Sequence, residues 1–113
     1  MLKKYPKISV VIPSFNQGSF IEETILSIIN QKYPNLELII IDGLSKDNTL
    51  EIVKKYFESI NYFVSEKDNG QSHALNKGFK IASGEICSYL NSDDIYIDNI
   101  LWKIAEQYRN KKL

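Results

Sequence analysis

Two apolar stretches decide the fold: ISVVI at residues 8–12 and LELIII at residues 36–41. Both are rich in β-branched residues and nearly continuous, a pattern typical of strands that are buried on both faces of a sheet. Two further apolar runs, at 62–64 and 86–90, have the length of short strands. The sequence therefore predicts four strands, which begin near residues 8, 36, 61 and 85.

The segments between these strands have helical periodicity. Apolar residues recur on one face of a helix in four places: after Ser19, after Asp47, over 74–82 and over 97–108. Ser19 and Glu22 form a capping-box pattern, and Asp47 suits the cap of the second helix. Gly84 is placed to end the third helix. Each strand is thus followed by one helix.

A strand and a helix about every 24 to 28 residues indicate parallel strands joined by right-handed crossovers. We predict one domain over residues 1–113, with a doubly wound, mostly parallel α/β sheet in a three-layer α/β/α arrangement. Ligands bind such sheets beyond the carboxyl ends of the strands, near the switch in strand order. The candidate loops are therefore residues 13–18, 42–49, 65–72 and 91–94.

The composition excludes several classes of function. Lys and Arg number 14 and so do Asp and Glu, which removes the electrostatic basis for nucleic acid or an anionic membrane as the main partner. One Cys and one His cannot build a zinc site of the usual kind, and a single Cys favours a reducing compartment, the cytoplasm. No apolar run approaches the length of a transmembrane segment, and neither nucleotide-binding glycine motif, GxGxxG or GxxxxGK[ST], is present.

Two adjacent carboxylates, Asp93 and Asp94, follow the fourth predicted strand. At a strand end they lie where a hard cation can bridge protein and phosphate oxygens. Like charges about 4 Å apart repel by about 4 kcal/mol at an effective dielectric constant near 20, so a diphosphate would need Mn²⁺ or Mg²⁺ beside them. The alternative is an acidic cluster at the N-terminus of the helix at 95–108, stabilised by the helix dipole. The spacing leaves both interpretations open.

Two more carboxylates lie in the candidate loops. Asp42 ends the second strand, where it would either accept hydrogen bonds from a nucleobase or ribose, or cap the following turn. Asp68 belongs to an Asp-Asn-Gly turn, and either it or Lys67 would line a nucleotide pocket if the loop is functional.

The remaining distinctive side chains are interpreted as structural. His73 suits a surface or capping group better than a catalytic base. Cys87 alternates within a strand and is expected to be an inert core residue. Trp102 and Tyr108 are expected to pack in the interior rather than stack on a sugar.

Four segments carry a resemblance to a known family. They are KISVVIPSFNQGSFIEETILSIINQ, IDGLSKDNT, DNGQSHALNKGFKIASGE and YLNSDD, in this order and over nearly the whole chain. Together they resemble the N-terminal, nucleotide-sugar-binding half of family 2 glycosyltransferases of the GT-A type. The resemblance implies a Rossmann-like fold of the nucleotide-diphospho-sugar transferase type. It also implies an inverting bacterial enzyme that transfers a sugar from a nucleotide-diphosphate sugar to an unknown acceptor, a glycan or lipid-linked sugar, in surface glycan synthesis.

The resemblance also implies roles for individual residues. Pro13 and Ser14 would frame the nucleoside pocket, Asp42 would contact the base, and Asp68 and Asp93 would belong to the nucleotide site.

The end of the fourth motif carries the metal expectation. By the same resemblance, Asp93 and Asp94 would hold Mn²⁺ or Mg²⁺ on the donor diphosphate. The metal would stabilise the charge that grows on the departing nucleoside diphosphate.

The chain also departs from the family pattern. Asn91 stands where Asp is common, which weakens one oxygen ligand, and Leu44 stands where Gly is usual, which argues against a left-handed backbone there. About 19 residues follow Asp94, and none matches the family's general base. We therefore expect a domain truncated at its C-terminal end, which binds the donor without robust turnover.

Other functions remain to be weighed. One alternative is a non-catalytic nucleotide-binding or docking module on the same fold. A nucleotidyltransferase is disfavoured because the first loop, PSFNQGS, has no Arg or Lys. An exposed sheet edge would also allow self-association.

Overall fold

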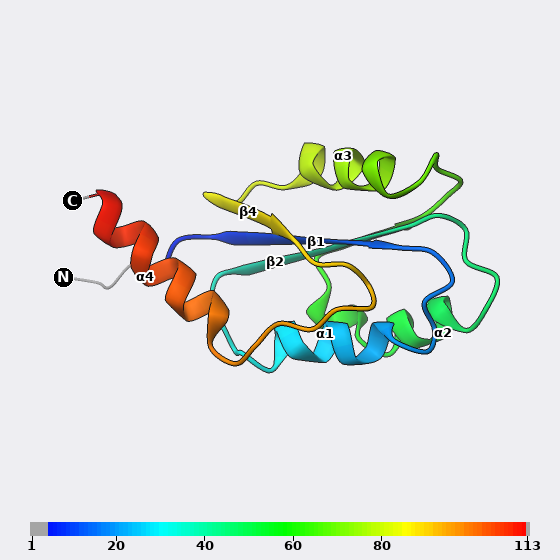
Figure 1. Cartoon of the computed structure of the whole chain (residues 1–113), viewed down its shortest axis with the longest axis horizontal. Helices are drawn as coiled ribbons and strands as arrows, with labels where there is room; N and C mark the ends of the chain where they lie inside the picture. The colour runs from blue at the N-terminus through cyan, green and yellow to red at the C-terminus, as the bar shows by residue number, and fades with distance from the viewer. Residues whose placement is uncertain (1–4, 113) are drawn as a thin grey trace.

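The computed structural model describes residues 5–112, which form a parallel sheet with helices on both faces (Figure 1). The strands are β1 (Ile8–Ser14), β2 (Leu36–Asp42), β3 (Tyr62–Ser65) and β4 (Ile86–Tyr89). The α-helices are α1 (Ile21–Ile29), α2 (Thr49–Lys54), α3 (Gln71–Ile81) and α4 (Ile100–Lys112), and a short 3₁₀ helix, η1 (Phe57–Ser59), precedes β3. The predicted alternation of strands and helices is confirmed. The predicted domain spans residues 1–113, of which 1–4 and 113 lie outside the described residues.

The strand order is β3-β2-β1-β4, and every neighbouring pair is parallel. Ser14 at the end of β1 stands opposite Asp42 at the end of β2. The chain moves outward from β1 to β3 and then returns to the other side of β1 as β4. The switch in strand order therefore lies between β1 and β4, and the predicted doubly wound α/β fold is confirmed.

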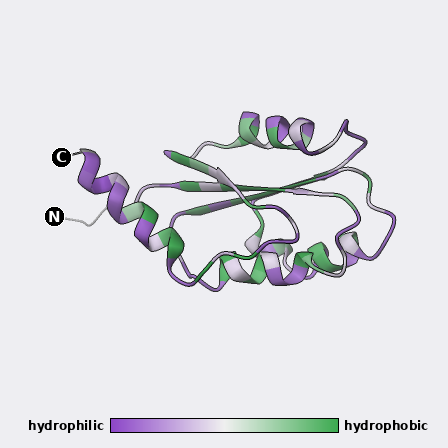
Figure 2. Ribbon diagram, viewed as in Figure 1, coloured by the Kyte–Doolittle hydropathy of each residue, from purple (hydrophilic) through white to green (hydrophobic). Residues whose placement is uncertain are grey.

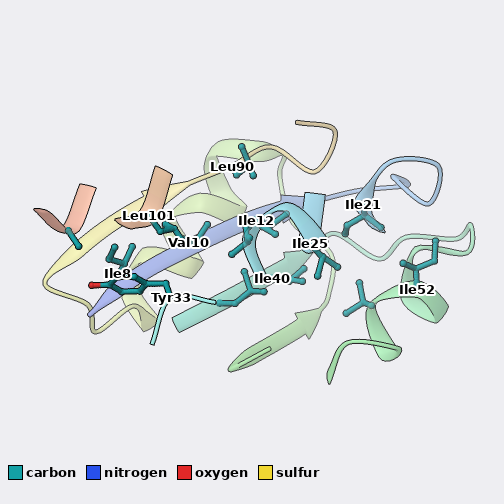
Figure 3. Close-up of a cluster of buried hydrophobic side chains, with 14 residues drawn as sticks. Ile8, Val10, Ile12, Ile21, Ile25, Tyr33, Ile40, Ile52, Leu90 and Leu101 are labelled. Atoms are coloured by element: carbon teal, nitrogen blue, oxygen red, sulfur yellow. The ribbon is translucent and has the colours of Figure 1, made fainter. Parts of the chain in front are cut away.

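Figure 1 shows α3 on one face of the sheet and α1 and α2 on the other. Because neighbouring side chains of a strand point to opposite faces, β1 supplies both layers. Ile8, Val10 and Ile12 pack with α1 and α4, whereas Val11 packs beneath α3 with Ala74. Figure 3 shows the larger of these clusters, and Figure 2 shows the apolar colouring of the central strands. Every residue of β1 is buried, as its continuous apolar pattern predicted.

Trp102 has the predicted packing role. Its ring lies edge-on to Tyr5 and Tyr33, with ring centroids 5.5 and 5.2 Å apart, and its Nε1 donates a hydrogen bond to the Gln31 carbonyl at 2.7 Å. This aromatic cluster fastens α4 to the chain before β2.

The two predicted helix caps at Ser19 and Gly84 are wrong. The N-cap of α1 is Phe20, with no side-chain cap bond, because the carbonyl of Gln17 already accepts the amides of residues 20 and 21. Gly84 lies beyond the end of α3, and its lack of a side chain lets the backbone lie close to Ser9 of β1 instead. Its amide donates to Ser9 Oγ at 2.8 Å, and a Cβ at Gly84 would lie 2.6 Å from the same oxygen.

The prediction that Cys87 lies in the core is also wrong. Cys87 is exposed because β4 is an edge strand of the described sheet, with Tyr89 half exposed on the same face. Self-association through this edge stays a prediction. Within residues 5–112, no helix combines the length and apolar character needed to cross a bilayer.

Candidate functional site

A pocket of about 550 Å³ opens at the carboxyl ends of β1 and β4, where the strand order switches. Its walls come from all four predicted loops and from the start of α3. The lining residues are Pro13, Ser14, Phe15, Gln17, Gly43, Asp68, Gly70, Gln71, Ala74, Asn91, Ser92 and Asp93. The only charged side chains among them are two aspartates, so the pocket is acidic.

The structure brings four of the six predicted site residues together at this pocket: Pro13, Ser14, Asp68 and Asp93. Asp42 and Asp94 do not line it. Their surroundings differ, since Asp42 is fully buried and Asp94 is exposed.

Ser14 has an unusual environment. The residue is only 5% exposed, and its Oγ is the one buried side-chain polar atom in the described residues that has no hydrogen-bond partner. Leaving such a group unsatisfied costs about 1–3 kcal/mol. Because Ser14 lines the pocket, we keep its hydroxyl as a candidate partner for a ligand atom there.

Asp42 instead has three partners within the protein. Its Oδ2 accepts hydrogen bonds from the Ser45 amide at 2.8 Å and from Ser65 Oγ at 2.7 Å, and its Oδ1 accepts one from Ser45 Oγ at 2.5 Å. These bonds join the ends of β2 and β3 and shape the turn after β2, as the capping interpretation predicts. Contact of Asp42 with a base stays a prediction.

The loops after β1 and β2 are held together by hydrogen bonds. The amides of Asn16, Gln17 and Gly18 donate to Ser45 Oγ, Thr49 Oγ1 and Asp47 Oδ2 at 2.7, 3.0 and 2.9 Å. The phosphate-accepting glycine loop of other nucleotide folds is thus replaced here by a loop whose amides are already paired.

Asp47 stabilises this contact from the start of α2. The hydrogen bond from the Thr49 hydroxyl lowers the pKa of Asp47, as do backbone amide donors, while burial opposes the shift. Asp47 also accepts the Thr49 amide at 3.0 Å, although the N-cap position itself is Asn48. Its structural interpretation agrees with these contacts.

The expectation that Leu44 avoids a left-handed backbone is wrong. Leu44 has φ 65°, and its side chain is 46% exposed. An L-residue in this region is disfavoured by about 1–2 kcal/mol. The hydrogen bonds between the loops after β1 and β2, together with those from Ser45 to Asp42, fix the turn and offset this cost.

Asp68 is positioned by the turn before α3 and by Gly43. Its Oδ1 accepts the Gly70 amide at 3.0 Å, and a Cβ at Gly43 would lie 3.0 Å from both carboxylate oxygens. His73 Nδ1 accepts the Asn69 amide at 2.9 Å, which supports the structural interpretation of this histidine. Lys67 does not line the pocket.

The loop after β4 is attached to α1. The Thr24 hydroxyl lies 3.0 Å from the Ser92 carbonyl and 2.5 Å from the Asp94 carbonyl, and the Tyr96 amide donates to Ser27 Oγ at 3.0 Å. Thr24 and Ser27 were not among the residues predicted from the sequence. The signal was present, because Thr24 is the one polar residue on the buried face of α1, beside Ile21, Ile25 and Ile28.

Comparison with known proteins shows which family the chain resembles. The sequence profile described as glycosyl transferase family 2 matches residues 9–112. An uncharacterized glycosyltransferase of Rickettsia typhi is 39% identical over 83% of this chain and 29% of its own length. The putative teichuronic acid biosynthesis glycosyltransferase TuaG of Bacillus subtilis is 37% identical over 89% of this chain and 41% of its own. The chain therefore spans less than half the length of each of these relatives.

Solved structures agree. S. aureus TarS 1–349 in complex with UDP-GlcNAc superposes with a TM-score of 0.81 at 31% identity, over 93% of this chain and 31% of the TarS 1–349 chain. The mannosyltransferase PcManGT of Pyrobaculum calidifontis, in complex with GDP-Man and Mn²⁺, has a TM-score of 0.74 at 31% identity, over 82% of this chain and 29% of its own. The profile match over residues 9–112, the relatives and the shared fold lead to one conclusion: this chain belongs to glycosyl transferase family 2.

Proposed function

We propose that this chain binds a nucleotide-diphosphate sugar and forms the donor-binding part of a glycosyltransferase. The observation that carries the proposal is the Ser14 hydroxyl, which is buried, without a partner and in the wall of the pocket at the strand switch. The crystallised relatives support it, since TarS is seen with UDP-GlcNAc and PcManGT with GDP-Man.

The first wall of the pocket suits a nucleoside. Pro13 and Ser14 line it together with Phe15, a residue that is 58% exposed. An exposed aromatic ring beside a polar group is suited to stacking on a base while the hydroxyl bonds to it. Asp68 faces the same space and is suited to accept hydrogen bonds from ribose hydroxyls. Asp42 would support this wall through Ser45 and, if the loops open, contact the base as the family resemblance implies.

The chemistry of the lining also fits a divalent cation. A diphosphate is anionic, and no Lys or Arg is among the described residues that line the pocket. No group of three or more His, Cys, Asp or Glu gathers as a complete metal site in the described residues. Mg²⁺ typically binds through one or two carboxylates plus substrate phosphates, so a complete site is not required.

We propose Mn²⁺ or Mg²⁺ at Asp93, with Asp94 as the second predicted ligand. Asp93 lines the pocket and Asp94 lies beside it in the same loop. When bound, the cation would neutralise the charge that develops on the departing nucleoside diphosphate. The protein's own contribution is to hold the donor between Ser14, Asp68 and Asp93 and to orient it for attack.

The attack of the acceptor on the sugar has no assigned residue in this chain. The residue that deprotonates the acceptor is not matched in the chain, so inversion at the sugar carbon and surface-glycan acceptors remain proposals from the family. We expect little or no sugar transfer by this chain alone. A non-catalytic nucleotide-binding module is the alternative outcome of the same experiments. Location in the cytoplasm remains an inference from the single Cys.

Calorimetric titration with UDP-, GDP- and dTDP-sugars, with Mn²⁺ and with EDTA, tests the proposal. At least one donor should bind, and chelation should weaken binding. Ser14→Ala should weaken it by about 3- to 10-fold, the loss expected for one hydrogen bond. Ser59→Ala, at an exposed site in η1, is the matched control. If no donor binds, or if Ser14→Ala binds as well as Ser59→Ala, the proposal fails.

A further inference from the structure

Three polar side chains form a row of hydrogen bonds that starts in the wall of the pocket, at Gln71 and Asn91, and ends beside it at Asp94. Gln71 Nε2 donates to Asn91 Oδ1, and Asn91 Nδ2 donates to Asp94 Oδ2 at 3.3 Å. Gln71 is the first residue of α3, and Asn91 and Asp94 belong to the loop after β4. These hydrogen bonds therefore join the start of α3 to the loop after β4, and Gln71 and Asn91 are 20 residues apart in the sequence.

We call Gln71, Asn91 and Asp94 the relay. The carboxylate of Asp94 determines which group donates and which accepts in each of its hydrogen bonds. A carboxylate is only an acceptor, so Asp94 must face the NH₂ group of Asn91. The carbonyl oxygen of Asn91 then faces Gln71 and needs a donor, which the Gln71 amide supplies. Each member is fixed by the next, and Asp94 anchors the whole relay.

The relay holds a loop whose other side is already attached. Thr24 of α1 bonds to carbonyls of residues 92 and 94, and the Asp94 amide donates to the Asn91 carbonyl at 3.0 Å, which closes a tight turn. With Gln71 on the α3 side, the turn is held from both helical layers. Asp93 lies at the centre of this turn, and its side chain is the one carboxylate of the turn that lines the pocket.

We propose that Gln71 and Asn91 are positioning residues that hold Asp94 as a structural anchor and thereby aim Asp93 at the ligand. This inference rests on the proposed donor site, and it replaces the predicted ligand role of Asp94 with a positioning role. Asp93 is the carboxylate that holds the cation, whereas Asp94 acts through the relay. Asn91 is required as an amide, because a carboxylate there would have no proton to give to Asp94 and would repel it.

Isosteric substitutions separate an anchor from a metal ligand. Asp94→Asn keeps a carbonyl oxygen that accepts from Asn91, so the relay survives, while Asp94→Ala breaks it. We expect Asp93→Asn to reduce Mn²⁺-dependent donor affinity more than 20-fold, Asp94→Ala about 5-fold and Asp94→Asn less than 2-fold. If Asp94→Asn is as damaging as Asp93→Asn, Asp94 is a ligand and the inference is overturned.

The role of Gln71 is tested with Gln71→Met, which keeps the length of the side chain but cannot donate. Donor affinity should fall about 5-fold, and Gln107→Met, at an exposed position of α4, should have no effect. In an Asp94→Ala background, Gln71→Met should have little further effect, although Gln71 and Asp94 share no direct hydrogen bond. Additive losses, or no loss in Gln71→Met, would overturn the positioning role.

A measurement without nucleotide distinguishes this inference from the proposed function. In the ligand-free protein, the NMR signals of the Asn91 side-chain amide should move in Gln71→Met and Asp94→Ala and stay in place in Asp94→Asn. If the Asn91 signals show these shifts but the wild type binds no donor, the proposed function fails and the positioning role fails with it. If donor binds but these signals ignore the relay substitutions, only the inference fails.

Discussion

Gly78 lies in the middle of α3 and faces the central strand. A Cβ at this position would lie 2.3 Å from Val11 Cγ1 and 3.0 Å from Val11 Cγ2. Val11 is a fully buried residue of β1 that packs beneath α3. Its methyl groups and the added Cβ therefore have no free space to move into. Gly78→Ala is therefore a direct test of how tightly this helix packs on β1.

Two opposing effects set the magnitude. In a helix interior Ala is better than Gly by about 0.8–1 kcal/mol, so helix propensity alone predicts a more stable protein. Forcing extra atoms into a packed core costs about 1–3 kcal/mol, and the contact at Gly78 is severe enough to place it at the upper end. A β-branched side chain has little rotamer freedom with which to avoid the clash. We expect a net loss of about 1–2 kcal/mol.

Urea unfolding followed by circular dichroism measures this loss as a lower midpoint at an unchanged slope. The control is the double variant Gly78→Ala/Val11→Ala, which removes the clashing methyl groups. Its destabilisation should be clearly smaller than the sum of the two single effects, because the residues are in contact. A Gly78→Ala protein as stable as the wild type, or strict additivity, would refute the packing argument.

Two further predictions concern the loops of the site. Gly43→Ala places a methyl group 3.0 Å from both oxygens of Asp68, so this carboxylate must move. Donor affinity measured by calorimetry should therefore fall about 3- to 10-fold. An unchanged affinity would contradict the assigned position of Asp68. The hydrogen bond from the Thr49 hydroxyl holds the folded-state pKa of Asp47 below its ordinary value, so the contribution of Asp47 to stability is complete above the unfolded pKa and is lost as the pH falls through the folded pKa. Urea unfolding from pH 6 to pH 2 should therefore show a stability advantage over Asp47→Asn that shrinks in acid, and an advantage that grows in acid would contradict the direction of the shift.

The fold was predictable because its signals are local. The stretches at 8–12 and 36–41 are apolar on both faces, which only a central strand of a covered sheet requires, and β1 and β2 are indeed the two inner strands. Spacing then placed the loops at one edge, where Pro13, Ser14, Asp68 and Asp93 meet.

The remaining features depend on strand order and long-range contacts. Cys87 was misplaced because alternation within a strand does not reveal whether that strand is at an edge. The Gln71 relay was missed because its partners lie 20 residues away, and no local pattern marks them. Leu44 shows the limit of propensity, since a network of hydrogen bonds from neighbouring loops overrides the preference for Gly.

The strand order has a consequence for how the protein folds. β1 precedes the other three strands of the described sheet, yet one of its neighbours, β4, pairs Ile86 with Ile8, 78 residues earlier. Parallel pairing over such a distance closes a large loop, and contacts of this kind form slowly. Since the pocket opens at the carboxyl ends of β1 and β4, we expect the ligand site to be completed last. A bound nucleotide would then favour the completed sheet by mass action, so that ligand supply and folding yield rise together.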